Sequence, residues 1–236
     1  MNNQEKSRRI IHSIFKTGVK IGKALLQFFF PIYCLKCRRE GKFLCAECAD
    51  DLPSADTYSL PDWILASFDY KNETVSQLVW RLKYAKQTAV ATEMVQIWHS
   101  RIIIWQKLAE IDRRQKILAI PTPLHWSKKM RRGFNQAEIL AQNLIKLEPD
   151  RWEEQKNLLK KIKNTKAQVK TKDRTERLEN LADAFVLKKN AGQMVRGRTI
   201  LLIDDVVTTG ATLTELRRLL LGAGAKKVLA ITFAHG

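Results

Sequence analysis

An uninterrupted aliphatic run, Ile200-Leu201-Leu202-Ile203, ends in two adjacent carboxylates, Asp204 and Asp205, and this feature constrains the fold more than any other. A continuous aliphatic run is typical of a strand that is buried on both faces of a parallel sheet. Two acidic side chains are too costly to bury inside such a sheet without partners, so we expect them at the strand's carboxyl end. The run therefore predicts an α/β domain with a ligand site at that edge.

The residues after the acids predict an anion pocket. Thr208, Thr209 and Gly210 form a turn that leads into a helix beginning near Thr212. The first backbone N–H groups of a helix lack intrahelical acceptors and carry the positive end of its dipole. Gly210 allows a ligand to approach the backbone closely, and the threonine hydroxyls add hydrogen-bond donors.

A ligand that carries both a phosphate and a diol would satisfy the anion pocket and the acids together. A ribose 5-phosphate is such a ligand, and Mg²⁺ could bridge its oxygens. The residues expected to bind it are Asp204, Asp205, Thr208, Thr209, Gly210, Ala211 and Thr212. Two other interpretations remain open: acids that merely cap local structure, and an acidic cluster that binds Mg²⁺ alone. The second would not need the Thr-Thr-Gly loop.

Strand and helix patterns alternate along the rest of the chain. Such alternation predicts βαβ units and a mostly parallel sheet covered by helices on both faces. We expect strands at 63–70, 117–120, 184–187, 199–205 and 227–234, and helices at 76–84, 90–109, 135–147 and 212–221.

A second loop has chemistry that matches the first. The strand at 117–120 runs into Pro121-Thr122-Pro123-Leu124-His125, and a cluster of cations follows at Lys128, Lys129, Arg131 and Arg132. Clustered cations beyond the end of a strand suit a diphosphate. His125 is a further candidate, although a lone histidine more often makes structural hydrogen bonds.

Two cysteine pairs, Cys34-x-x-Cys37 and Cys45-x-x-Cys48, are spaced to place four thiolates around one ion. This spacing is typical of a structural zinc knuckle, because four protein thiolates leave no open coordination position. Gly41 supplies the reversing turn between the pairs. An iron–sulfur cluster and redox disulfides are the alternatives.

The charge balance indicates an acidic partner. The chain of 236 residues holds 42 Lys+Arg against 24 Asp+Glu, a formal net charge of +18, which attracts phosphate esters, nucleic acid or anionic lipid. Basic residues dominate the segment 156–177, where we expect a mobile loop or solvated edge. The apolar run at 24–30 is too short to span a membrane, so we expect an amphipathic helix and a cytoplasmic protein.

The segment from Ile200 to Thr212 resembles the signature with which type I phosphoribosyltransferases bind 5-phosphoribosyl 1-diphosphate (PRPP). The resemblance implies their fold, a mostly parallel sheet flanked by helices, and binding of PRPP together with Mg²⁺. In those enzymes the corresponding first loop holds the pyrophosphate. That role would fall to Thr122, Pro123, Leu124 and His125, with Arg132 close by.

A wider set of motifs, spanning nearly the whole chain, resembles the ComF family of bacterial proteins, which are linked to competence and natural transformation. The set comprises the cysteine pairs, Leu82-Lys83-Tyr84, Pro121-Thr122-Pro123-Leu124, Arg132-Gly133-Phe134-Asn135-Gln136, Thr165, Gln168, Arg177, Asn180, Phe185 and the Asp-Asp-Thr-Thr-Gly segment. The expected organisation is an amphipathic helix over 1–31, a four-cysteine zinc knuckle over 32–52 and a phosphoribosyltransferase-like domain over 60–236.

The resemblance implies a PRPP-binding protein that takes part in DNA uptake or processing, with DNA and a helicase-like protein as partners. The alternative is an active phosphoribosyltransferase that transfers ribose 5-phosphate from PRPP to a nucleobase or amine. A third possibility is a zinc-containing DNA-binding module whose sugar phosphate pocket is a relic. The acceptor, the oligomeric state and the DNA strand preference do not follow from the sequence.

Overall fold

The computed structural model describes the chain except for residues 1–30, 86, 109–110, 112–113 and 164–182. The chain divides into two compact units, Met1–Cys48 and Ala49–Gly236, which are described separately below. The amphipathic helix expected over 1–31 lies almost wholly outside the described residues. The expected domain boundaries therefore stay predictions.

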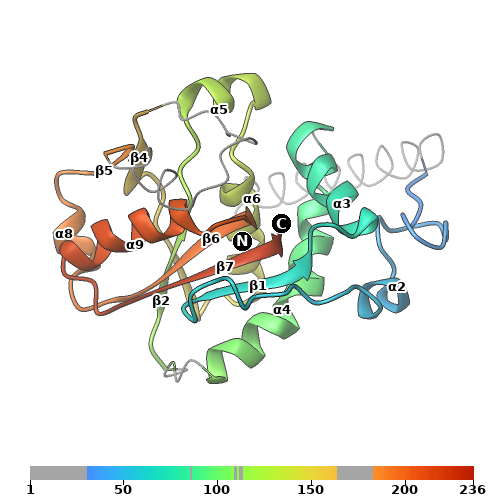
Figure 1. The fold of residues 1–236 in the computed structure, drawn as a ribbon, viewed down its shortest axis with the longest axis horizontal. Helices are drawn as coiled ribbons and strands as arrows, with labels where there is room; N and C mark the ends of the chain where they lie inside the picture. The colour runs from blue at the N-terminus through green and yellow to red at the C-terminus, as the bar shows by residue number, and fades with distance from the viewer. Residues whose placement is uncertain (1–30, 86, 109–110, 112–113, 164–182) are drawn as a thin grey trace, which may run out of the picture. The chain divides into compact units, whose positions relative to one another are not determined.

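The larger unit is built on a five-stranded sheet with the order β1-β7-β6-β2-β3. All four neighbouring strand pairs are parallel, which confirms the expected fold class. Figure 1 shows β1, in cyan, beside β7, in red, although the two lie far apart in the sequence. The strands are β1 Ile64–Asp69, β2 Ile117–Pro121, β3 Trp152–Glu154, β6 Thr199–Val207 and β7 Lys227–His235.

Helices alternate with these strands, as the sequence predicts. The helix α3 begins at an N-cap, Asn72, whose side chain accepts a hydrogen bond from the backbone N–H of Val75. The helix α6 begins in the same way at Asn135. The helices are α2 Ala46–Asp50, α3 Glu73–Tyr84, α4 Val90–Leu108, α5 Trp126–Arg132, α6 Gln136–Leu147, α8 Ala191–Val195 and α9 Ala211–Gly222.

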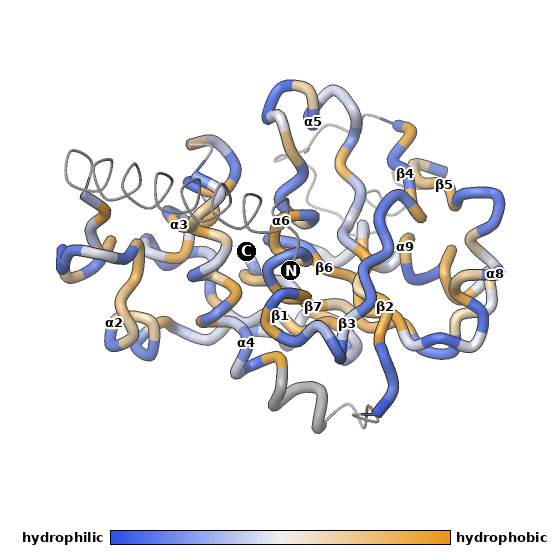
Figure 2. Tube along the Cα trace, turned by 180° about the vertical axis from the view of Figure 1, so that it is seen from behind, coloured by the Kyte–Doolittle hydropathy of each residue, from blue (hydrophilic) through white to orange (hydrophobic). Residues whose placement is uncertain are grey.

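The strand β6 lies at the centre of the sheet and is buried on both faces. Ile200 and Leu202 pack into one core cluster with residues of α9, α8 and β5. Because successive side chains of a strand point to opposite faces, Leu201 and Ile203 face the other side of the sheet, and both are buried. In Figure 2 the hydrophobic colouring is concentrated in the strands. The aliphatic run is therefore a fully covered central strand, as predicted.

The structure contains elements that the sequence did not predict, including the strand β3 and the helix α8, and it also differs in two cation-rich segments. Residues 126–132 form the helix α5, where the sequence had indicated only a loop with clustered cations. Within the predicted loop or solvated edge at 156–177, residues 159–161 form the strand β4 (Leu159–Lys161), which pairs antiparallel with β5 (Phe185–Leu187). Leu159 is buried in the main core, which explains why this part of the segment is ordered. Residues 164–177 lie outside the described residues.

Among the described residues, none of the helices combines the length and the apolar character that a bilayer crossing requires.

Candidate functional site

The two acids lie at the carboxyl end of β6, where the neighbouring strand β2 also ends. The strand register pairs Pro121 with Ile203, and the backbone N–H of Thr122 donates to the carbonyl of Ile203 at 2.9 Å. The loop that begins at Thr122 therefore starts directly beside Asp204. The sheet brings together the two segments in which the sequence predicted a sugar phosphate site and a diphosphate site.

Burial, reinforced by the neighbouring carboxylate of Asp205, raises the pKa of Asp204 to about 7. The backbone N–H of Asp205, the charge of Lys83 and a hydrogen bond from Thr122 act in the opposite direction but do not cancel this rise. The Asp204 carboxyl group is therefore held near the midpoint of its titration at neutral pH, in a place where hydroxyl donors would stabilise its charged form.

The second acid is paired with a buried lysine. The Nζ atom of Lys83, near the end of α3, lies 2.9 Å from Oδ2 of Asp205, and the two side chains are 19% and 8% exposed. Burial acts to lower the pKa of Lys83, but the charges of Asp205 and Asp204 outweigh it, so the pKa is raised overall. Lys83 is thus a fixed counter-charge inside the acidic edge of the sheet.

The turn after β6 has the geometry of an open helix N-terminus. Gly210 is the N-cap of α9, has a φ of 74°, and offers no side-chain cap to the helix. The first intrahelical hydrogen bond runs from the N–H of Thr214 to the carbonyl of Gly210. The preceding amides are therefore available to an anion. A Cβ added at Gly210 would lie 3.1 Å from Cδ1 of Ile64, so an alanine here would crowd that side chain and would also strain the backbone at this φ.

The histidine of the second loop has a structural role in this arrangement. His125 is only 5% exposed and forms the N-cap of α5, where its Nδ1 accepts from the backbone N–H of Ser127 at 3.3 Å. Nearby, the side-chain amide of Asn135 donates to the carbonyl of Thr122 at 2.9 Å. These contacts hold the loop 122–125 in place against α5 and α6.

Arg132 at the end of α5 is held by two partners. Its Nη1 donates to Oε1 of Gln136 at 2.9 Å and its Nη2 donates to the hydroxyl of Tyr84 at 3.2 Å. The guanidinium carbon lies 5.1 Å from the centre of the Tyr84 ring, within the range of a cation–π contact. Tyr84 follows Lys83, so the end of α3 contacts both the acidic pair and α5.

Two further lysines are close to these groups. Burial, followed by the positive charges of Arg132 and Arg131, lowers the pKa of Lys128. Burial and the charge of Lys128 lower the pKa of Lys161, on β4, to about 8, although Asp204 acts in the opposite direction. Cations that are partly desolvated and repel one another would be stabilised by a polyanion placed among them.

Lys128 belongs to the cation cluster that the sequence suggested for a diphosphate, whereas Lys83 and Lys161 were not among the predicted site residues. Lys83 carried one signal, its place in the Leu82-Lys83-Tyr84 motif of the family resemblance. Lys161 carried no such signal, since it is one of many basic residues in its segment. The motif residues Thr165, Gln168, Arg177 and Asn180 lie outside the described residues.

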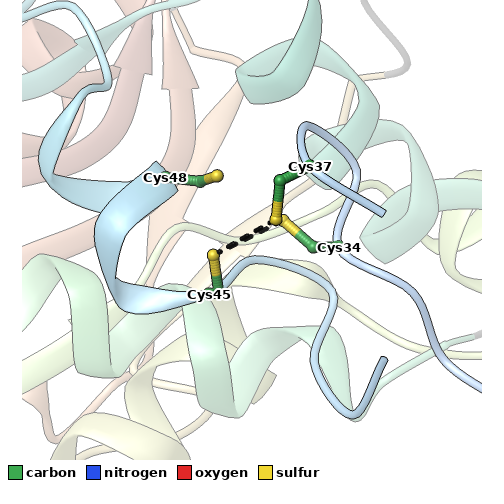
Figure 3. Close-up of side chains that lie close together, drawn as sticks. All are labelled: Cys34, Cys37, Cys45 and Cys48. Atoms are coloured by element: carbon green, nitrogen blue, oxygen red, sulfur yellow. Dashed lines mark hydrogen bonds between the residues drawn. The ribbon is translucent and has the colours of Figure 1, made fainter. Parts of the chain in front are cut away.

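The cysteine side chains of the smaller unit converge on one point (Figure 3). Their sulfur atoms lie within 4.8 Å of one another, and the Sγ of Cys45 is 3.8 Å from that of Cys34 and 3.6 Å from that of Cys37. Four sulfurs about 2.3 Å from a tetrahedral zinc are about 3.8 Å apart, so the spacing fits such an ion. Gly41 turns the chain between the pairs at a φ of 107°. The four cysteines could therefore hold a metal ion.

The thiols strongly influence one another's ionisation. Although burial opposes it, backbone hydrogen bonds lower the pKa of Cys34 to about 6. A hydrogen bond to Cys45, with burial and the charge of Cys34, raises the pKa of Cys48 to about 12. Ionisation of one thiol thus makes ionisation of its neighbours less favourable. A divalent cation bound among them would allow all four to ionise together.

Comparison with known proteins agrees with this arrangement. A family model described as a phosphoribosyl transferase domain matches residues 130–236, a range that includes β6, the Thr-Thr-Gly turn and α9. Competence protein F of Haemophilus influenzae is 29% identical over 205 residues, which are 84% of this chain and 82% of that protein.

Two further relatives have related names. DNA utilization protein YhgH of Escherichia coli (strain K12) is 27% identical over 208 residues, 83% of this chain and 85% of that protein. Competence protein ComFC of Bacillus subtilis (strain 168) is 40% identical over 105 residues, 44% of this chain and 38% of that protein.

Proposed function

We propose that the larger unit of this chain, which belongs to the ComF family, binds PRPP and that the protein acts in DNA uptake or processing. One observation carries the proposal. The acidic end of β6, the open N-terminus of α9 and the loop after β2 share one edge of the sheet. That edge offers acceptors for a diol, donors for a phosphate and cations for a diphosphate.

The ribose 5-phosphate half of PRPP would occupy the acids and the turn. Its hydroxyls donate to the carboxylates, and its phosphate accepts from the amides and hydroxyls of the turn. The residues assigned to this half are Asp204, Asp205, Thr208, Thr209, Gly210, Ala211 and Thr212. Asp204 gains from such donors, because its own environment disfavours the charged form.

The diphosphate half would occupy the second loop. Thr122, Pro123, Leu124, His125 and Arg132 frame it, with His125 acting through the cap of α5 and not by direct contact with the reacting atoms. Lys128 and Lys161 supply the cations that the diphosphate would stabilise. Mg²⁺ bound with PRPP would neutralise charge between the sugar and diphosphate oxygens.

The second candidate function is phosphoribosyl transfer to a nucleobase or amine. It is favoured by the partly buried cations Lys128 and Lys161, since fixed positive charge beside C1 of the sugar stabilises a departing pyrophosphate. In this reaction the chain's residues position PRPP, and they stabilise the charge that develops as the bond at C1 breaks. A screen for PRPP-dependent pyrophosphate release, run over a panel of nucleobases and amines, separates an enzyme from a binding protein.

We assign zinc to the four cysteines of the smaller unit. Its role there would be structural, because Cys34, Cys37, Cys45 and Cys48 fill all four coordination positions. A helicase-like partner, implied by the family resemblance, stays a prediction.

Calorimetric titration of PRPP with Mg²⁺ tests the binding proposal. Wild type should bind, and Asp204→Asn should lose about tenfold or more in affinity, because the amide cannot accept as a charged acceptor does. Asp204→Asn leaves the Lys83–Asp205 pair intact, and a cooperative thermal melt shows that the variant is folded. No heat from wild type at millimolar ligand would refute PRPP binding.

A further inference from the structure

The ring of His235 bridges two segments at the carboxyl end of the sheet. His235 is the last residue of β7, and the strand register pairs it with Val207 of β6, the residue before the Thr208 turn. Its Nε2 lies 3.1 Å from the carbonyl oxygen of Thr208, and its Nδ1 lies 2.5 Å from the carbonyl oxygen of Asp56. The ring therefore contacts the turn on one side and the chain before β1 on the other.

Both contacts require the ring to donate. A carbonyl oxygen can only accept, so each ring nitrogen that faces one must carry the hydrogen. A neutral imidazole has a single N–H and would direct the lone pair of its other nitrogen at a carbonyl oxygen. The imidazolium has two N–H groups and satisfies both contacts. The geometry thus suits a cationic ring beside Thr208.

The contact with Thr208 fixes the orientation of a peptide group in the turn. None of the described peptide bonds is cis. A trans peptide directs its carbonyl oxygen and the following N–H to opposite sides. Because the carbonyl of Thr208 is turned towards His235, the N–H of Thr209 points away from the ring. That N–H is among the amides assigned to the phosphate of PRPP.

The segment 53–61, which carries the second carbonyl partner, also reaches the turn. It lies along β1, where the N–H of Asp69 donates to the carbonyl of Pro53 at 3.1 Å. Near its end, Leu60 is buried in the main core, and its Cδ2 would lie 3.8 Å from a Cβ at Gly210. The histidine ring therefore joins the turn to a segment that is itself packed on the sheet.

We propose that His235 is a positioning residue for the 5-phosphate of PRPP. As an imidazolium it holds the carbonyl of Thr208 away from the ligand, so that the N–H of Thr209 faces the phosphate. Its charge adds to the positive end of the α9 dipole. The inference rests on the proposed PRPP binding, and it adds to that site a residue outside the Ile200–Thr212 segment. The ring acts through the peptide group and through its charge, without contact with the sugar.

The other charged groups around the ring are compatible with an imidazolium. Asp69 of β1 is paired with His235 in the strand register, and the carboxylate of Asp56 belongs to the segment 53–61. The charged and titratable side chains on the surrounding elements are Asp56, Asp69, Tyr70, Lys71, Lys83, Asp204 and Asp205. Of the two lysines, Lys83 is paired with Asp205. The acids in this set outnumber the cations, so an added positive charge meets no cationic cluster.

Calorimetric titration of PRPP with Mg²⁺ into the full chain tests the inference. At about pH 6, His235→Gln should bind PRPP about tenfold more weakly than wild type, because the amide carries no charge. His235→Arg, which keeps a charge and several donors, should retain most of the affinity.

The pH profile separates this role from simple packing. Wild type should match His235→Arg at about pH 6 and approach His235→Gln at about pH 8.5, because histidine loses its proton between these values. Asp204 titrates in all three proteins, so its opposite effect on affinity cancels from their ratios. His99→Gln is the matched control: His99 lies on α4 and pairs with Glu148 of α6, so this variant should keep the wild-type profile.

Binding and protonation should reinforce one another. If the imidazolium strengthens PRPP binding, PRPP must stabilise the imidazolium by the same factor. In ¹⁵N NMR spectra of histidine-labelled protein, both ring nitrogens of His235 should carry hydrogen at about pH 6. Saturating PRPP, and ribose 5-phosphate as a second probe, should move the loss of that proton to higher pH. Comparison with His235→Gln assigns the signals.

Three results would overturn the inference while PRPP binding stands. They are equal PRPP affinity of wild type and His235→Gln across this pH range, a loss in His235→Gln that His235→Arg does not restore, and a ring whose protonation PRPP leaves unchanged. Cooperative thermal melts show that the variants are folded, and the NMR titration of wild type decides the matter if one of them is not. Absence of PRPP binding in wild type would refute the proposed function and this inference with it.

Discussion

The ammonium of Lys83 lies 2.9 Å from Oδ2 of Asp205, and this ion pair connects the end of α3 to the end of the central strand. Both side chains are largely buried, so each charge depends on the other. The same end of α3 carries Tyr84, which contacts Arg132. Two motifs that lie far apart in the sequence thus meet at the acidic edge of the sheet.

Lys83→Met should lower the free energy of unfolding by about 3 kcal/mol, because it leaves the Asp205 carboxylate buried without its counter-charge. Chemical denaturation at pH 7 measures the loss. The double variant Lys83→Met with Asp205→Asn should recover much of it, since neither charge then remains. Lys129→Met is the control: its pair with Glu138 is 45% and 24% exposed, so its removal should cost at most about 1 kcal/mol. Equal losses from the two lysine variants would contradict this view of the buried pair.

Asp204 should make stability depend on pH. Its pKa is about 7 in the folded chain against an ordinary 3.8, so the folded state holds this proton more tightly than the unfolded state does. The contribution of Asp204 to the free energy of unfolding therefore falls as pH rises from about 4 to about 7. In Asp204→Asn the side chain cannot ionise, so this decrease in the free energy of unfolding is absent. The free energy of unfolding of the variant minus that of wild type should therefore increase between pH 5 and pH 8 by on the order of 3 kcal/mol.

Denaturation curves at the two pH values check the prediction for Asp204. Asp150→Asn, at an exposed position, should track wild type at both. A difference in free energy of unfolding between Asp204→Asn and wild type that stays constant from pH 5 to pH 8 would contradict this prediction. A ligand that donates hydroxyls to the carboxylate should bind more tightly above pH 7 than below pH 6, because ionised Asp204 is the better acceptor.

Gly210→Ala should impair both folding and ligand binding. The residue has a φ of 74°, which costs an L-residue about 1 to 2 kcal/mol, and its added Cβ would meet Ile64 at 3.1 Å. Because the amides that follow belong to the proposed phosphate loop, PRPP affinity should fall as well. Gly222→Ala, with nothing within 4 Å of its Cβ, should leave PRPP affinity as in wild type. Comparable affinity of both variants for PRPP would count against the role of the turn.

The cysteine cluster should hold about one zinc ion per chain, measured by elemental analysis of the purified protein. Cys45→Ser should reduce zinc to a small fraction, because one of four ligands is lost and the remaining thiols must still ionise beside one another. Visible absorption with iron in place of zinc would identify an iron–sulfur cluster instead. Zinc retained after all four cysteines are changed to serine would refute the assignment.

The sequence predicts the central strand well because its physical requirement is local: only a strand covered on both faces tolerates Ile200 to Ile203 in succession. The same holds for α6, whose apolar periodicity and Asn135 cap are visible in the sequence, whereas the prediction for α3 began at 76 and missed its first turn and the Asn72 cap. The helix α5 escaped prediction because none of its seven residues is buried, so it has no apolar period to detect.

The contacts between distant segments are what the sequence does not reveal. The pairing of Lys83 with Asp205 depends on the approach of α3 to β6, and the contact of Arg132 with Tyr84 depends on where α5 begins. Lys161 is brought towards Asp204 by β4, whose three residues carry no clear strand pattern and whose pairing with the predicted strand at 184–187 the sequence does not reveal. Tertiary packing, and not local pattern, assembles this part of the candidate site.

A crystal structure of the protein with PRPP and Mg²⁺ tests the central claim most directly. The account predicts the 5-phosphate within hydrogen-bonding distance of the amides of residues 209–212, with the sugar hydroxyls on Asp204 and Asp205 and the diphosphate beside Thr122. A sugar phosphate bound elsewhere, with the acidic pair and the Thr208 turn empty at saturating ligand, would contradict it.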